Sequence, residues 1–326
     1  TYTATDAAGN TATATRTVTV VEPDPLTYLV EGNSVTVTDC DESYSGALVI
    51  PSSYNGKPVT AIGNNAFENC SNLTSVTIPD SVTMIGNFAF YRCSAMESVT
   101  FPDSVASIGE SAFAYCAALT SVTIPSSVTS IHRYTFWQCG RLERVQLPDS
   151  LSSIQVGAFE KCGALKSVAL PASVTLIENS AFSACLSLMG IEVNSANIQY
   201  ASDDGVLFNK EKTILLVFPA GRSGHYNIPA HVTTIGANAF GGSSIGSITI
   251  PDTVVSIHNA AFQGCMHLES VIIPDSINVI NDYVFSHCGS LESVTIPNSV
   301  TSIGTGAFAH SSKLIQITIP NPDCVI

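Results

Sequence analysis

Apolar and polar positions follow a pattern that repeats every 23 residues along most of this chain. One copy has the form P-D-S-V-x-x-I-G-x-x-A-F-x-x-C-x-x-L-x-S-V-x-I, after which the proline returns. Ten phenylalanines mark the copies, each with an isoleucine five residues earlier: Phe67, Phe90, Phe113, Phe136, Phe159, Phe182, Phe240, Phe262, Phe285 and Phe308. A fixed period of about 20–29 residues with the spacing L-x-x-V-x-I predicts a leucine-rich-repeat solenoid, in which each copy forms one rung.

The second copy shows what one rung should look like. Residues 73–78 alternate apolar side chains with Ser and Thr, which predicts a strand with one buried and one exposed face. Pro79 ends that strand because proline has no N–H for the ladder. Residues 82–85 return to the core as a second short strand, and residues 87–93 wind into a helical or 3₁₀ turn. We expect an α/β fold: a right-handed solenoid with a parallel concave sheet, short helical or 3₁₀ turns on the convex side and a continuous phenylalanine spine.

The chain divides into three parts. Residues 1–24 alternate Thr with apolar residues around the turn D-A-A-G-N, which predicts a β-hairpin and a linker. This segment resembles the last strands of bacterial immunoglobulin-like and hyalin-type repeats, and a remnant of that kind implies a piece of a longer exported protein. Residues 25–45 predict a second hairpin, an N-terminal β cap for an otherwise open end. The solenoid covers residues 46–326, with an irregular insertion at 194–228 that contains a strand, a turn and a strand.

Charge narrows the classes of partner. The chain has 12 Lys+Arg against 26 Asp+Glu, a net charge of −14, which disfavours nucleic acids and anionic membranes. Only 12% of its residues are charged, so Ser, Thr and Asn must build the surface, as suits an extracellular or cell-surface protein. No apolar run approaches the roughly 20 residues of a membrane span, so we expect no membrane insertion.

The cysteines follow the repeat. Eight of the ten occupy one column: Cys70, Cys93, Cys116, Cys139, Cys162, Cys185, Cys265 and Cys288. A column is a packing position, and a free cysteine behaves there as a small buried hydrophobe. We therefore expect reduced thiols, with disulfides or metal ligation as the alternatives; no C-x-x-C pair supports a zinc site.

No group of residues outside the repeat suggests catalysis. Of the seven histidines, His132, His258, His287 and His310 occupy variable surface positions of the repeat, and there is no G-x-S-x-G elbow, P-loop or dinucleotide fingerprint. An aspartate column permits weak Ca²⁺ association or is simply a solvated acidic edge: Asp80, Asp103, Asp149, Asp252 and Asp275. The sequence predicts a protein that is not an enzyme and holds no cofactor or metal.

A hydroxyl column follows the repeat proline and completes the family pattern. Ser81 begins this column, and Ser or Thr recurs there in place of the Asn of plant and animal repeats, so we expect these hydroxyls to bond turn N–H groups. With the A-F-x-x-C signature, the pattern resembles the BspA-like leucine-rich repeats of bacterial surface proteins. The resemblance implies an exported bacterial protein of a family linked to adhesion to host matrix or to other microbes.

The fourth rung departs most from the consensus. It contains the only Trp, and five of the 12 basic residues lie within 34 positions around it. Trp and Arg often anchor interfaces, so this rung and the next predict a partner-binding site. The candidate residues are Arg144, Gln146, Glu143, Lys166, Trp137, Arg133 and Arg141. The predicted function is adhesion or protein binding; the alternatives are a structural spacer and a carbohydrate-binding surface.

Overall fold

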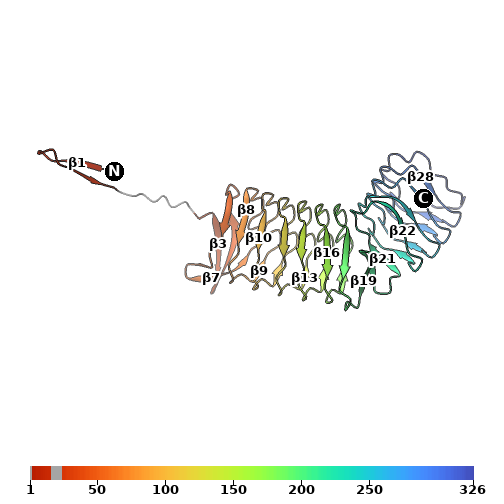
Figure 1. The fold of residues 1–326 in the computed structure, drawn as a ribbon, viewed down its shortest axis with the longest axis horizontal. Helices are drawn as coiled ribbons and strands as arrows, with labels where there is room; N and C mark the ends of the chain where they lie inside the picture. The colour runs from red at the N-terminus through yellow and green to blue at the C-terminus, as the bar shows by residue number, and fades with distance from the viewer. Residues whose placement is uncertain (1, 16–23) are drawn as a thin grey trace.

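The computed structural model describes residues 2–15 and 24–326 and places the copies as successive rungs of one elongated stack (Figure 1). Each regular rung contributes one strand before its proline and a shorter strand after it. Neighbouring rungs pair in parallel with a 23-residue register, so that Ser98 lies opposite Ser75 and Ile108 lies opposite Ile85. The solenoid predicted from the repeat is therefore confirmed, including its second short strand.

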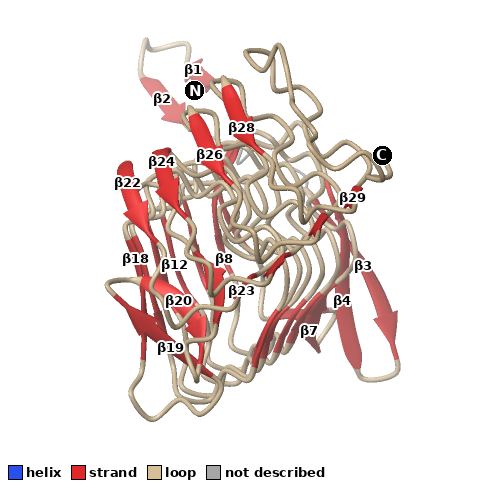
Figure 2. Ribbon diagram, turned by 90° about the vertical axis from the view of Figure 1, so that its right-hand side faces the viewer, coloured by secondary structure: helices blue, strands red, loops and turns tan. Residues whose placement is uncertain are grey.

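Two series of strands form two sides of the stack (Figure 2). The pre-proline strands are β5 (Gly46–Val49), β8 (Leu73–Thr77), β10 (Ser98–Thr100), β12 (Ser121–Thr123), β14 (Arg144–Gln146), β16 (Ser167–Leu170), β18 (Gly190–Val193), β22 (Gly224–Asn227), β24 (Ile245–Thr249), β26 (Ser270–Ile272) and β28 (Ser293–Thr295). The post-proline strands are β7 (Lys57–Ile62), β9 (Met84–Ile85), β11 (Ser107–Ile108), β13 (Ser130–Ile131), β15 (Ser153–Ile154), β17 (Leu176–Ile177), β21 (Ile214–Val217), β23 (Thr234–Ile235), β25 (Ser256–Ile257), β27 (Val279–Ile280) and β29 (Ser302–Ile303).

Two hairpins precede the regular rungs. Strands β1 (Tyr2–Thr5) and β2 (Thr11–Ala14) pair antiparallel around the predicted turn, and all their residues are exposed. Strands β3 (Leu26–Glu31) and β4 (Ser34–Cys40) form the second hairpin; β4 pairs in parallel with β7, which also carries the short β6 (Ser53–Tyr54). Val35 and Val37 of β4 are fully buried, so this hairpin covers the first rung. The domain boundaries and the immunoglobulin-like origin of the first hairpin stay predictions, and Glu22 and Pro23 of the linker lie outside the described residues.

The phenylalanines stack along the core. Nine of the ten are fully buried, and Phe308, in the last rung, is partly buried. From Phe67 to Phe182 the neighbouring ring centroids lie 4.7–5.7 Å apart with nearly parallel planes. Each ring therefore packs on its neighbours both above and below, which is how a rung of a solenoid buries surface that it cannot bury alone.

The insertion interrupts this spine, so the prediction of a continuous phenylalanine spine is wrong. Strands β19 (Tyr200–Asp203) and β20 (Val206–Asn209) pair antiparallel, and β20 continues antiparallel to β21, close to the predicted strand, turn and strand. Three consecutive residues of β20 are buried because the strand lies inside the stack. A second stack then begins at Phe218, whose ring lies 4.9 Å from Phe240, and continues to Phe308.

The turns after the second strand are not helical, which corrects the expectation for residues 87–93. The described residues contain no helix. Two residues of each turn are left-handed instead, as in Phe88 and Arg92 with φ of 57° and 61°. The N–H groups of Phe88, Phe90 and Arg92 donate to carbonyls of the next rung at 2.7–2.9 Å. Because these N–H groups bond along the stack, they are not available for the i→i−4 bonds of a helix.

The hydroxyl column also acts differently from the prediction. Instead of accepting turn N–H groups, the hydroxyls donate to backbone carbonyls of an earlier rung. Ser104 donates to the carbonyl of Val82 at 2.7 Å, and Ser276 donates to that of Val254 at 2.6 Å. A side chain that bonds to the neighbouring rung ties two rungs together, which a bond inside its own turn would not do.

Candidate functional site

The exposed side of the pre-proline strands carries the predicted partner site. In most rungs Ser and Thr occupy its outward positions, as with Ser121 and Thr123 on β12. On β14 the outward positions are Arg144 and Gln146, which lie opposite Ser121 and Thr123 in the ladder and are exposed. The strand alternation therefore projects both side chains from a surface of mostly small, uncharged side chains, as the sequence predicted. Their role in binding stays a prediction.

A surface ion pair borders these two side chains. The Lys166 ammonium lies 2.6 Å from the Glu143 carboxylate, with both side chains about half exposed. The hydrogen bond and charge of Lys166 hold the pKa of Glu143 below its usual range, and the charges of Arg144 and Arg141 add to the effect. An exposed pair of this kind adds little stability. Among the ion pairs of the described residues, none includes Arg144, so its charge is available to a partner.

Trp137 lies elsewhere on the rung. It belongs to the turn after β13, where its ring meets Tyr115 and Tyr134 edge to face at 4.8 and 5.8 Å. The Lys161 ammonium lies 5.4 Å from the indole centroid, and the indole Nε1 is buried without a hydrogen-bond partner. Arg133 is exposed in the same turn. The seven predicted residues thus form two groups: Arg144, Gln146, Glu143 and Lys166 with the nearby Arg141, and Trp137 with Arg133.

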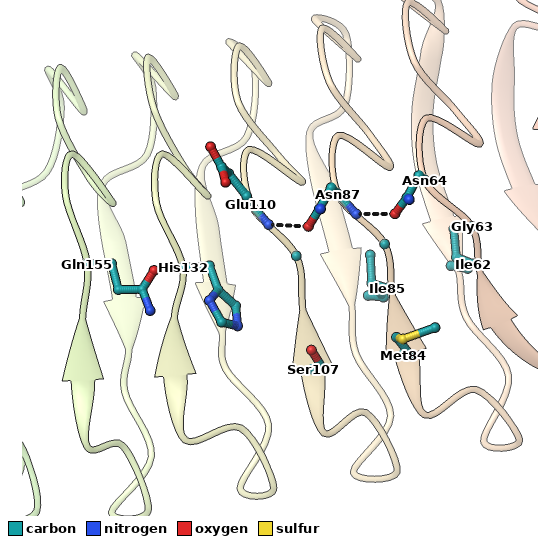
Figure 3. A pocket seen from close by; sticks show the side chains of 12 residues that line it. Ile62, Gly63, Asn64, Met84, Ile85, Asn87, Ser107, Glu110, His132 and Gln155 are labelled. Atoms are coloured by element: carbon teal, nitrogen blue, oxygen red, sulfur yellow. Dashed lines mark hydrogen bonds between the residues drawn. The ribbon is translucent and has the colours of Figure 1, made fainter.

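A shallow groove along the post-proline side was not anticipated. Figure 3 shows a ladder of asparagines along this groove. The side-chain oxygen of Asn64 accepts the backbone N–H of Asn87 at 2.8 Å, and the side-chain oxygen of Asn87 accepts the backbone N–H of Glu110 at 2.9 Å. Gly86 is needed beside this ladder, because a Cβ there would lie 2.6 Å from the Asn64 side chain. His132 and Gln155 occupy the glycine position in later rungs. The sequence signal was an Asn in one rung followed by a Gly 22 residues later.

The column cysteines lie inside the core. All eight column cysteines are buried and free, as predicted. Burial raises the pKa of the Cys139 thiol to about 12, so it stays protonated at neutral pH. Within residues 2–15 and 24–326, no three His, Cys, Asp or Glu side chains gather as metal ligands. The same residues include no helix long and apolar enough to span a membrane.

Known proteins share this architecture. Residues 60–189 and 222–324 match the family described as BspA type Leucine rich repeat region. A leucine rich cell surface protein from Faecalibacterium prausnitzii A2-165 is 31% identical, with 94% of this chain and 96% of that chain covered and a TM-score of 0.68. A leucine-rich repeat protein from Bacteroides ovatus ATCC 8483 is 28% identical, with 90% and 81% covered and a TM-score of 0.54.

A more distant structure shows the same fold. The pneumococcal vaccine antigen PcpA is 22% identical, with 96% of this chain and 90% of that chain covered and a TM-score of 0.75. No curated protein matches the chain by sequence.

Proposed function

Because the chain belongs to the BspA-type leucine-rich-repeat family, we propose that it is a non-enzymatic surface protein whose solenoid binds a protein partner during adhesion. The similar protein from Faecalibacterium prausnitzii is a cell surface protein, which supports an extracellular location. The partner is a protein of the host matrix or of another microbial surface. A spacer function is the alternative, in which the stack holds other domains away from the cell.

The observation that carries this proposal is the interruption of the hydroxyl face at β14. Ser and Thr side chains offer short, neutral hydrogen-bonding groups that bind weakly and without selectivity. Arg144 and Gln146 extend beyond that surface, and Arg144 lies outside the ion pairs of the described chain. On a molecule of net charge −14, a local cation selects an acidic patch on a partner and makes association depend on salt.

The variant Arg144→Ser with Gln146→Thr tests the site, because it restores the side chains of β12. We expect binding to a responsive matrix protein, found in a panel of purified extracellular-matrix proteins, to weaken at least threefold at low salt. Unfolding should change little, since both side chains are exposed. Ile272→Thr on β26 is the matched control, because it restores an exposed outward position far from β14 without changing the charge, and it should leave affinity within twofold.

Two results would count against the proposal. If the double variant changes the affinity of a responsive protein by less than twofold, the site at β14 is wrong. If neither matrix proteins nor microbial surface proteins bind, the adhesive function is wrong and the spacer alternative is favoured.

A further inference from the structure

A row of aromatic side chains runs along the turns of the second, third and fourth rungs. This aromatic edge comprises Phe88, Tyr91, Tyr115, Tyr134 and Trp137, all partly exposed. Neighbouring rings meet edge to face, with centroid distances of 5.7 Å for Phe88–Tyr91, 5.5 Å for Tyr91–Tyr115, 4.8 Å for Tyr115–Trp137 and 5.8 Å for Trp137–Tyr134. The row lies on the turns rather than on the pre-proline strands, so it is a surface separate from Arg144.

Three of these aromatic residues occupy strained backbone positions. Phe88, Tyr115 and Tyr134 have φ of 57°, 62° and 55°, a left-handed conformation that is unfavourable for bulky side chains. In other rungs the same two columns often carry residues that tolerate it: Asn65, Asn69, Gly157, Asn238, Gly242, Gly264 and Gly306. The fold therefore accepts Asn or Gly at these columns, and its own stability does not require aromatic rings there. Because the stack imposes this backbone in every rung, bulky aromatic residues cost more there than Asn or Gly would, and their retention with exposed rings points to a binding role.

Cations accompany the rings. The Arg92 guanidinium lies 5.2 and 5.4 Å from the centroids of Tyr91 and Tyr115, and Lys161 lies 5.4 Å from Trp137. Arg133 is exposed in the same turns. None of the three takes part in an ion pair of the described residues. Three carboxylates, those of Glu68, Glu110 and the half-buried Glu160, also lie in or beside these turns, but the cations that contact the rings, Arg92 and Lys161, favour an acidic ligand at the rings themselves.

The spacing of the rings identifies the kind of ligand. Two bulky aromatic pairs, Phe88 with Tyr91 and Tyr134 with Trp137, are two rungs apart. In the rung between, the same two columns carry small residues, and Tyr115 from the neighbouring column joins the two pairs. Two rungs of parallel strands span about 9.6 Å. Three residues of a polyproline II helix span about 9.3 Å, and such helices bind aromatic-lined surfaces. We propose that the aromatic edge binds an acidic, proline-rich segment of a partner protein, with prolines three residues apart on successive aromatic pairs.

Trp137 provides the assay because it is the only tryptophan of the chain. A 12-residue peptide of repeating Pro-Pro-Glu should change its fluorescence with a saturating curve. A Gly-Ser-Glu peptide of equal length and charge should bind at least tenfold more weakly, because it is not preorganised. Tyr134→Asn should weaken binding of the Pro-Pro-Glu peptide at least tenfold. Its left-handed backbone suits Asn, so thermal unfolding should stay within a few degrees of the parent.

The chain offers a matched control in Tyr283. This residue has φ of 56°, and its ring lies over Gly306 as that of Tyr134 lies over Gly157; a Cβ on these glycines would lie 2.7 and 2.4 Å from the respective rings. Tyr283→Asn therefore removes the same strain and the same packing outside the aromatic edge. It should change peptide affinity by less than twofold, as should Arg144→Ser with Gln146→Thr.

Four outcomes would overturn the inference. No fluorescence response at 1 mM peptide would exclude the ligand class. Equal binding of the Gly-Ser-Glu peptide would reduce the effect to charge alone. Full affinity in folded Tyr134→Asn, checked with Tyr115→Asn, would exclude the aromatic edge. A saturating response to chitohexaose or oligogalacturonate, without one to the peptide, would assign the surface to glycans. The β14 double variant separates all of these from a failure of the adhesion site.

Discussion

Replacing Cys139 by serine or by alanine distinguishes two explanations of the cysteine column. The repeat alone suggests a column of small hydrophobes. In the structure, each thiol from the second rung onward also donates to the carbonyl of a phenylalanine in an earlier rung, with Sγ···O distances of 3.1–3.2 Å: Cys93, Cys116, Cys139, Cys162, Cys185, Cys265 and Cys288. In the last rung Ser311 takes the same position and donates to Phe285 at 2.7 Å.

The two explanations predict opposite orders of stability. Alanine at position 139 removes the thiol donor, while the N–H of Cys116 still donates to the same Phe113 carbonyl at 3.2 Å, so the change loses one hydrogen bond and costs about 0.5–1.5 kcal/mol. Loss of the sulfur from a fully buried site adds about 1 kcal/mol. Serine keeps the donor, as Ser311 does, and should cost no more than about 1 kcal/mol. If the column were only hydrophobic, burying a hydroxyl would make serine the worse replacement.

Urea unfolding followed by circular dichroism measures the order. We expect the parent to be most stable, Cys139→Ser to follow within about 1 kcal/mol, and Cys139→Ala to lose about 1.5–2.5 kcal/mol. The m-values should agree, so that midpoints compare stability and not a changed unfolded state. An alanine variant as stable as the serine variant, or more stable, would refute the proposed role of the thiol as a donor.

Two further predictions concern the same core. Phe159 stacks between Phe136 and Phe182, at 5.5 and 5.6 Å, so Phe159→Ala should lower the free energy of unfolding by about 3–5 kcal/mol. Phe308→Ala, in the partly buried last rung, should lower it by less than half as much. Equal losses in urea unfolding would contradict stacking on both sides. The contribution of the buried thiols to stability should be constant below about pH 8.5. It should fall as pH rises from there towards 12, by about 1.4 kcal/mol per pH unit for each such thiol, because burial raises the folded-state pKa of Cys139 and Cys185 to about 12 while the unfolded thiols ionise near 8.5. Unfolding midpoints measured from pH 7 to 11 check the sign, and a midpoint that rises would contradict it.

The 23-residue pattern by itself determined the rung, the inward columns and the direction of exposed strand residues. This was possible because every regular copy makes the same contacts with its neighbours, so that one position in ten copies is one structural environment. The alternation of β14 likewise showed that Arg144 and Gln146 face outward. The break in period located β20 and β21, although not the interruption of the phenylalanine spine.

Only the tertiary structure decided which atoms of neighbouring rungs bond to each other. The apolar pattern shows that Cys139 is buried, but its partner is a carbonyl 26 residues earlier, and this depends on the register and tilt of stacked turns. The pattern also favoured a helical turn around Phe88, whereas bonding along the stack imposes a left-handed backbone there. For the same reason the aromatic edge joins residues from separate copies, each of which looks ordinary within its own copy. Contacts between copies arise from stacking geometry, which no single copy encodes.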